Sequence, residues 1–179
     1  IIERQPLGQH FDAVALRPGQ GHATGLHAAR AKITVIHGRF RDFARLCAQF
    51  GLAWRQQLKG LERQIIPAVG PQGVFEGEAV WSRKGEGLSY LEQGTLTLQG
   101  QPPMQAERRY FWDAEMNVFF DDGRFFHQVP SLGGEAAHWC DPDQYDVHYD
   151  FSGWPSFETR WKVRGPRKNY AMITRYSRQ

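Results

Sequence analysis

Residues 75–98, FEGEAVWSRKGEGLSYLEQGTLTL, decide the fold. Apolar or small side chains occupy every second position on both sides of a turn signal at residues 84–87, and the positions between them are mostly polar. Residues two apart share one face of a β-strand, so this period of two predicts two strands joined by a short turn. The stretch therefore predicts an antiparallel pair of strands with one face on a core.

The same period of two continues to the end of the chain. Turn signals separate the apolar runs, and the Asp122-Gly123 pair is a specific hairpin signal. Further strands are predicted over residues 104–112, 116–120, 125–129, 145–151, 157–163 and 168–176. Many consecutive strands joined by short turns are typical of an antiparallel up-and-down barrel, whose closure removes exposed strand edges. We therefore expect a mainly β fold, a barrel of about 8–10 strands preceded by an N-terminal helix.

Three segments divide the chain. Residues 1–37 form a poorly defined N-terminal segment, in which Gly19–Gly25 fits either a flexible turn or a phosphate-binding loop. Apolar residues recur every three or four positions over residues 38–60, which predicts a helix that packs on or caps the barrel. The β-barrel domain is predicted to occupy residues 61–179.

Composition limits the class of function. An apolar fraction of 41% and a charged fraction of 23% are typical of a globular protein. The net charge is only +3, and the basic residues are interleaved with acidic ones, so a nucleic-acid partner is not expected. No apolar run approaches the roughly 20 residues of a membrane helix. The two cysteines, Cys47 and Cys140, do not make a disulfide framework, which favours a reduced, cytoplasmic protein.

An ordered series of short motifs runs through the predicted barrel. It comprises Leu88-x-Tyr90-x-Glu92-x-Gly94, Arg108-Arg109-Tyr110-x-Trp112, Asp122-Gly123-Arg124-x-Phe126-His127, His138-x-Cys140-x-Pro142-Asp143-x-Tyr145 and Trp161-x-Val163-x-Gly165-Pro166-Arg167-Lys168-x-Tyr170. In order and spacing the series resembles a bacterial domain-of-unknown-function family, number 6314, over roughly residues 60–178. The resemblance implies a lipocalin-like (calycin-type) barrel. It implies no established activity.

Two charged residues fall on apolar faces of consecutive predicted strands. Glu92 shares a face with Tyr90, and Arg108 shares a face with Tyr110 and Trp112. A buried charge must be paired, so we expect Glu92 and Arg108 to meet inside the barrel. Two interpretations stay open at this point. The pair is a structural ion pair, or Glu92 orients the Arg108 guanidinium to receive an anionic group.

Other polar residues lie on apolar faces of later strands. His127 falls between apolar positions, and Tyr145, Tyr149 and Tyr170 need hydrogen-bond partners if they are buried. Together they form a candidate polar network around a ligand or around waters. The basic corner at Gly165–Lys168 either binds an acidic group at the barrel mouth or is a solvated turn.

The segment His138–Asp143 contains residue types that bind zinc, but it equally fits a turn with aspartate hydrogen bonds. A closed zinc site needs four convergent ligands, and no paired Cys-x-x-Cys is present. We therefore expect no metal, and no cofactor is implied.

These residues predict a small-molecule-binding barrel for an amphipathic or aromatic ligand with an anionic group. Arg108 and Lys168 would hold the anion. The walls would come from Tyr90, Tyr110, Trp112, Tyr149, Trp161 and Tyr170. The expected partner is a small molecule rather than nucleic acid or a membrane, and the oligomeric state, including a homodimer, stays open.

Two alternatives use the same barrel. One is an enzyme acting on a small carboxylated substrate. Phenolic-acid decarboxylases resemble this architecture, and Glu92 would act as acid or base there. The other is haem binding through His127 or His138, as in nitrobindin-like barrels.

Overall fold

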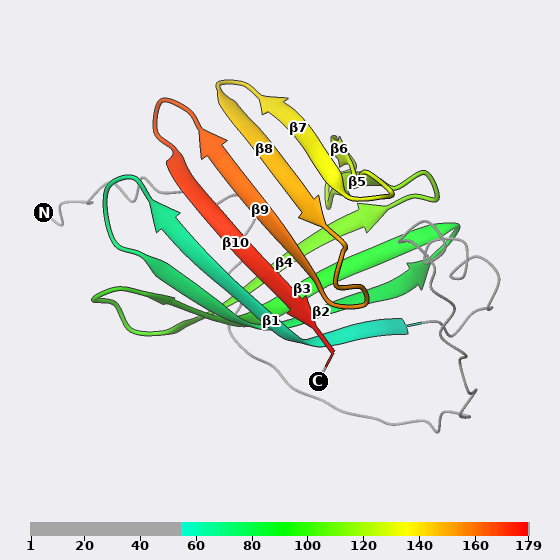
Figure 1. Ribbon diagram of the computed structural model, residues 1–179, viewed down its shortest axis with the longest axis horizontal. Helices are drawn as coiled ribbons and strands as arrows, with labels where there is room; N and C mark the ends of the chain where they lie inside the picture. The colour runs from blue at the N-terminus through cyan, green and yellow to red at the C-terminus, as the bar shows by residue number, and fades with distance from the viewer. Residues whose placement is uncertain (1–54, 179) are drawn as a thin grey trace, which may run out of the picture.

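The computed structural model describes residues 55–178, which form ten antiparallel β-strands (Figure 1). The strands are β1 (Arg55–Pro67), β2 (Gly73–Lys84), β3 (Gly87–Leu98), β4 (Met104–Trp112), β5 (Asn117–Phe120), β6 (Phe125–Gln128), β7 (Gly134–Cys140), β8 (Asp143–Asp150), β9 (Phe157–Arg164) and β10 (Asn169–Ser177). The predicted mainly β fold and strand number are confirmed. This part of the chain contains no helix, and so none with the length and apolar character needed to cross a membrane.

All ten strands belong to one sheet in the order β6-β5-β4-β3-β2-β1-β10-β9-β8-β7. Because β1 pairs with both β2 and β10, the first and last strands join and the sheet curls into a nearly closed barrel. In Figure 1, β7–β10 form one wall and β2–β4 cross it on the opposite side. The sheet ends at β6 and β7, which face each other without a hydrogen-bonded ladder. The Phe126 and His138 rings, 5.2 Å apart between centroids, pack across this seam.

The hairpin that the sequence predicts over residues 75–98 is present as β2 and β3. Its centre is a glycine pair, Gly77 opposite Gly94. A Cβ on Gly77 would lie 2.2 Å from the Gln93 carbonyl oxygen, and one on Gly94 would lie 2.2 Å from the Glu76 carbonyl oxygen. Only glycine therefore permits the two backbones to approach so closely at this point.

Aromatic rings fill one end of the barrel. The Trp81 side chain packs against Tyr90, Trp112 and Tyr176, with ring centroids 4.5, 6.1 and 6.2 Å away. Tyr176 in turn stacks on Phe157 at 4.2 Å. Burial of such large rings contributes strongly to the stability of a small barrel. These rings pack beside the cavities described below.

The predicted helix covers residues 38–60. Its first part, residues 38–54, lies outside the described residues, and so does the predicted N-terminal segment 1–37. Residues 55–60 belong to β1, so this part of the helix prediction is wrong. Leu58, the last residue of the predicted apolar stripe, is a buried residue of β1, 3% exposed. A register shift in the pairing of β1 with β2 follows it, between Leu58 and Leu61, and both leucines face the core.

Candidate functional site

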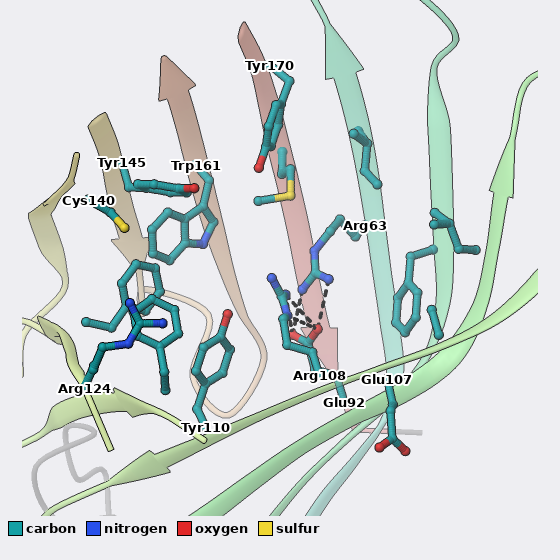
Figure 2. A pocket seen from close by; sticks show the side chains of 17 residues that line it. Arg63, Glu92, Glu107, Arg108, Tyr110, Arg124, Cys140, Tyr145, Trp161 and Tyr170 are labelled. Carbon is teal, nitrogen blue, oxygen red and sulfur yellow. Dashed lines mark hydrogen bonds and ion pairs between the residues drawn. The ribbon is translucent and has the colours of Figure 1, made fainter. Parts of the chain in front are cut away.

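The barrel contains a cavity of about 180 Å³, the main cavity (Figure 2). Aromatic side chains form much of its wall, and a charged cluster lies on one side. The aromatic lining residues are Phe75, Tyr110, Phe120, Phe126, Tyr145, Trp161 and Tyr170. The Phe126 ring stacks on Trp161 and on Tyr110, with centroids 5.3 and 5.8 Å away. These flat surfaces are suited to an apolar or aromatic ligand.

The charged cluster, named here the interior cluster, consists of Arg63, Glu92 and Arg108. Arg63 donates from Nη1 and Nη2 to the two Glu92 carboxylate oxygens at 2.9 and 2.6 Å. Arg108 donates from Nε at 2.9 Å and from Nη2 at 2.7 Å to Glu92 Oε2, with a third bond from Nη2 to Oε1 at 2.9 Å. Such forked bonds between guanidinium and carboxylate are strong and orient both groups.

Strand pairing explains why these three side chains meet. Glu92 and Arg108 are direct partners in the pairing of β3 with β4, as the alternation in the sequence led us to expect. Arg63 comes from β1, where it is paired with Phe75 of β2 and its guanidinium lies 5.5 Å from the Phe75 ring centroid. The Arg63, Glu92 and Arg108 side chains are 7%, 2% and 16% exposed. One carboxylate and two guanidinium groups give this largely buried cluster a net charge of +1.

Glu92 stays ionised in this setting. Burial alone would raise the pKa of the Glu92 carboxyl, but the charges of Arg108 and Arg63 outweigh burial and hold that pKa far below its usual value. A general acid or base works best with a pKa near the working pH. Glu92 therefore serves to hold the two arginines and is poorly suited to proton transfer.

Of the guanidinium nitrogens in the interior cluster, Arg108 Nη1 is the one that donates no hydrogen bond within residues 55–178. Arg63 Nε donates to Thr174 Oγ1 at 2.8 Å, so all three of its nitrogens are engaged. Tyr90 and Tyr176 donate their hydroxyls to Glu92 Oε1 at 2.5 and 3.2 Å. Arg108 Nη1, in contrast, donates no hydrogen bond to the described residues. Since Arg108 lines the main cavity, its Nη1 group is the available donor of the cluster.

A second charged group, named here the rim cluster, consists of Asp143, Tyr145 and Lys168. Lys168 Nζ donates to the Tyr145 hydroxyl at 2.7 Å and lies 2.9 Å from Asp143 Oδ2. Gly165 leaves room for this arrangement, because a Cβ there would lie 1.8 Å from Asp143 Oδ1. Tyr145 lines the main cavity and Lys168 does not. The rim cluster is electrically neutral, and Tyr145 connects it to the main cavity.

A smaller cavity of about 40 Å³, the inner cavity, lies against the main one. Glu92, Arg108, Tyr110 and Trp161 line both cavities, and Phe126 does so too. The remaining site residues predicted from sequence divide between the two: Tyr145 and Tyr170 line the main cavity only, whereas Tyr90, Trp112, His127 and Tyr149 line the inner cavity only. Lys168 lines neither.

Sequence reasoning missed two arginines at the main cavity. Arg63 lies two residues from Leu61 and two from Ile65, so the three side chains share one strand face. The sequence therefore contains a signal for an inward charge. Arg124 follows the Asp122-Gly123 turn, where no strand face is defined. Its guanidinium lies 5.4 Å from the Phe120 ring centroid and is paired with Asp122, while 70% of the side chain is exposed. A turn residue of this kind gives no signal in a period-of-two pattern.

The segment that resembled a zinc site divides between different surroundings. His138 packs beside Phe126, Cys140 lines the main cavity, and Asp143 is paired with Lys168. Within residues 55–178, no three histidine, cysteine or acidic side chains are grouped in a way that could hold a metal ion. For haem, His127 is 3% exposed and its Nε2 atom is bonded to Tyr149, which leaves no accessible imidazole nitrogen there.

The fold and the site can now be set beside known proteins. The sequence model of the family DUF6314, described as a family of unknown function, matches residues 54–178. This range is more than half of the chain and covers the whole barrel. The chain belongs to this family. No curated protein and no solved structure matches it. In this DUF6314 protein, Glu92 and Arg108 of the interior cluster line both cavities.

Proposed function

We propose that this DUF6314 protein binds a small organic acid in the main cavity. The anionic group of the ligand bonds to Arg108 Nη1, and its apolar part packs on the aromatic wall. The observation that carries the proposal is the net charge of +1 on the interior cluster beside a cavity. An unbalanced buried charge is costly, so an anion that enters the cavity gains both a counter-charge and two N–H donors.

The cavity also limits the size of the ligand. Pockets for drug-sized molecules measure about 300–1,000 Å³, whereas the main cavity measures about 180 Å³. A single aromatic ring or a short aliphatic chain with one carboxylate suits this volume better than a larger amphipathic molecule. The ten-stranded order and the internal cavity support a lipocalin-like (calycin-type) architecture as part of the same proposal.

Benzoate, with benzamide as its neutral counterpart, is a suitable first pair of probes. Benzoate is expected to raise the melting temperature of the full chain, and benzamide is expected to have little effect. Arg108→Gln removes the charged donor and should weaken benzoate binding, measured by calorimetry, about tenfold or more.

Arg109→Gln is the matched control. Arg109 is the next residue of β4, lies on the outer face and pairs with Glu107. Its substitution should leave benzoate affinity unchanged. Equal affinities of the Arg108 and Arg109 variants would contradict the proposal, as would the absence of any response to benzoate, phenylacetate and hexanoate in the wild-type protein.

The two alternatives from the sequence have no such observation in their favour. The decarboxylase-like hypothesis assigned proton transfer to Glu92, and the lowered pKa of Glu92 works against that role. The haem hypothesis needs an accessible histidine. His127 is buried and bonded to Tyr149, whereas His138 is partly exposed and packs on Phe126, so haem binding through His138 stays a prediction. The cytoplasmic location stays a prediction, and the oligomeric state stays open.

A further inference from the structure

Two buried threonines on neighbouring strands differ in one respect. Thr159 of β9 and Thr174 of β10 are direct register partners, and they are 3% and 0% exposed. The Thr174 hydroxyl accepts a hydrogen bond from Arg63. The Thr159 hydroxyl has no hydrogen-bond partner in the structure. Buried hydroxyl groups are nearly always bonded, so the Thr159 hydroxyl calls for a partner beyond the side chains of residues 55–178.

A second buried polar atom without a partner among the described residues belongs to His127, which lines the inner cavity together with Thr159. His127 Nδ1 has none, while His127 Nε2 lies 2.7 Å from the Tyr149 hydroxyl. Burial lowers the pKa of His127 to about 3, with a smaller contribution from His138, so the imidazole is neutral. Burial also raises the pKa of Tyr149 well above its usual value, so the phenol keeps its proton.

The proton arrangement follows from the bonds that the structure offers. If the Tyr149 hydroxyl donates to Nε2, then Nδ1 carries the imidazole proton and only one donor is left unbonded. The opposite tautomer would leave both the phenol proton and the Nδ1 lone pair unbonded. The first arrangement is therefore favoured, and His127 presents an N–H donor.

The inner cavity, which both residues line, has the size of a small polar occupant. The inner cavity has a volume of about 40 Å³, and a water molecule needs roughly 10–15 Å³ by this kind of measure. Glu92 and Arg108 both line the cavity and are paired with each other, whereas the two unbonded groups are neutral, so a neutral occupant suits them. A neutral oxygen that accepts from the His127 N–H and bonds to the Thr159 hydroxyl would satisfy both groups.

We propose that the inner cavity is a hydrogen-bonding subsite for a neutral hydroxyl oxygen, held by His127 Nδ1 and the Thr159 hydroxyl. The oxygen belongs either to ordered water or to a hydroxyl group on the acid bound in the main cavity. The subsite itself does not depend on the proposed acid binding, since its first test uses the protein alone.

Thermal unfolding of the full chain without ligand tests whether the subsite is occupied. Thr159→Val keeps the shape of the side chain and removes the hydroxyl. We expect it to lower the melting temperature, as Thr174→Val must do by removing the partner of Arg63. A Thr159→Val melting temperature equal to or above that of the wild type would show a dry cavity and overturn the proposal.

A second pair of variants covers the case in which the valine does not fit. Thr159→Ser and Thr159→Ala both remove the methyl group, and only serine keeps the hydroxyl. The serine variant should melt at the higher temperature. Equal melting temperatures, or a more stable alanine variant, would overturn the proposal independently of valine packing.

The source of the oxygen is distinguished by comparing benzoate with 3-hydroxybenzoate and 4-hydroxybenzoate. If a ligand hydroxyl enters the inner cavity, one hydroxybenzoate binds about tenfold more tightly than benzoate to the wild type, and this advantage disappears in Thr159→Val. If water fills the subsite, the three acids bind alike and only the melting-temperature difference is seen. Failure of all three acids to bind would contradict the proposed function and leave the thermal test of the subsite intact.

Discussion

The interior cluster and the rim cluster use the same kinds of groups and differ in how their charge is balanced. In the interior, two arginines share Glu92, which leaves an excess positive charge beside the main cavity. At the rim, Lys168 has Asp143 to itself and also bonds to Tyr145. The comparison shows that a cation near a pocket is available to a ligand only if the protein has not already neutralised it.

The largest difference between the clusters should be in stability. Glu92→Gln leaves two largely buried guanidinium groups without a counter-charge, and we expect it to lower the free energy of unfolding by about 3–5 kcal/mol. Asp143→Asn leaves only one ammonium group without its counter-charge, and Lys168 keeps its bond to Tyr145, so it should cost less, about 1–3 kcal/mol. Urea unfolding curves with equal slopes would measure both changes.

Glu135→Gln is a control for the loss of a carboxylate charge, because 75% of the Glu135 side chain is exposed. Its effect should stay within about 0.5 kcal/mol. The distinction between the clusters would fail if Asp143→Asn destabilised the protein as much as Glu92→Gln.

A smaller effect concerns histidines inside and outside the barrel. The pKa of His127 is lowered to about 3, against about 6.5 in an unfolded chain. The unfolded state therefore binds the extra proton below pH 6.5, so the contribution of His127 is complete above that pH and is lost as the pH falls toward 3. Between pH 6.5 and pH 4.5 the wild type should lose about 2–3 kcal/mol from this residue alone.

His127→Gln should flatten the stability profile in that pH range. His148→Gln should not, because His148 lies on the outer face of β8 beside Glu135. The range from pH 6.5 to pH 4.5 separates His127 from Glu92. Because the pKa of Glu92 is lowered in the folded protein, its contribution to stability is lost only below the unfolded carboxyl pKa of about 4.3. A His127→Gln profile as steep as that of the wild type would show that the buried imidazole is charged.

Regular strand pairing explains what the sequence could predict. From β2 to β4 the register runs without a shift, so counting by two places Glu92 opposite Arg108 correctly. The same counting fails where the ladder is irregular. The register shift between Leu58 and Leu61 interrupts the period of two near the start of β1, so the alternation that places Arg63 inward begins only at Leu61.

Turns are the second reason why parts of the site could not be predicted from the sequence. Lys168 lies two positions before Tyr170, which suggests a shared face, but it precedes the first residue of β10. There the side chain is directed by the turn and by Asp143, which comes from β8. A contact between a turn and a distant strand has no period, so the sequence alone could not tell that Lys168 is neutralised and Arg108 is not.

The smallest expected effect is on benzoate affinity, and it tests whether Lys168 or Arg108 binds the anion. Lys168→Met should change benzoate affinity by less than about threefold, because the Lys168 charge is balanced by Asp143 and does not line the main cavity. Asp143→Asn unbalances that charge and should tighten benzoate binding slightly at low salt. The gain should vanish at 1 M salt, where the screening length is about 3 Å. A loss in Lys168→Met as large as that in Arg108→Gln would instead make the rim cluster part of the anion site, as counting along the sequence suggests.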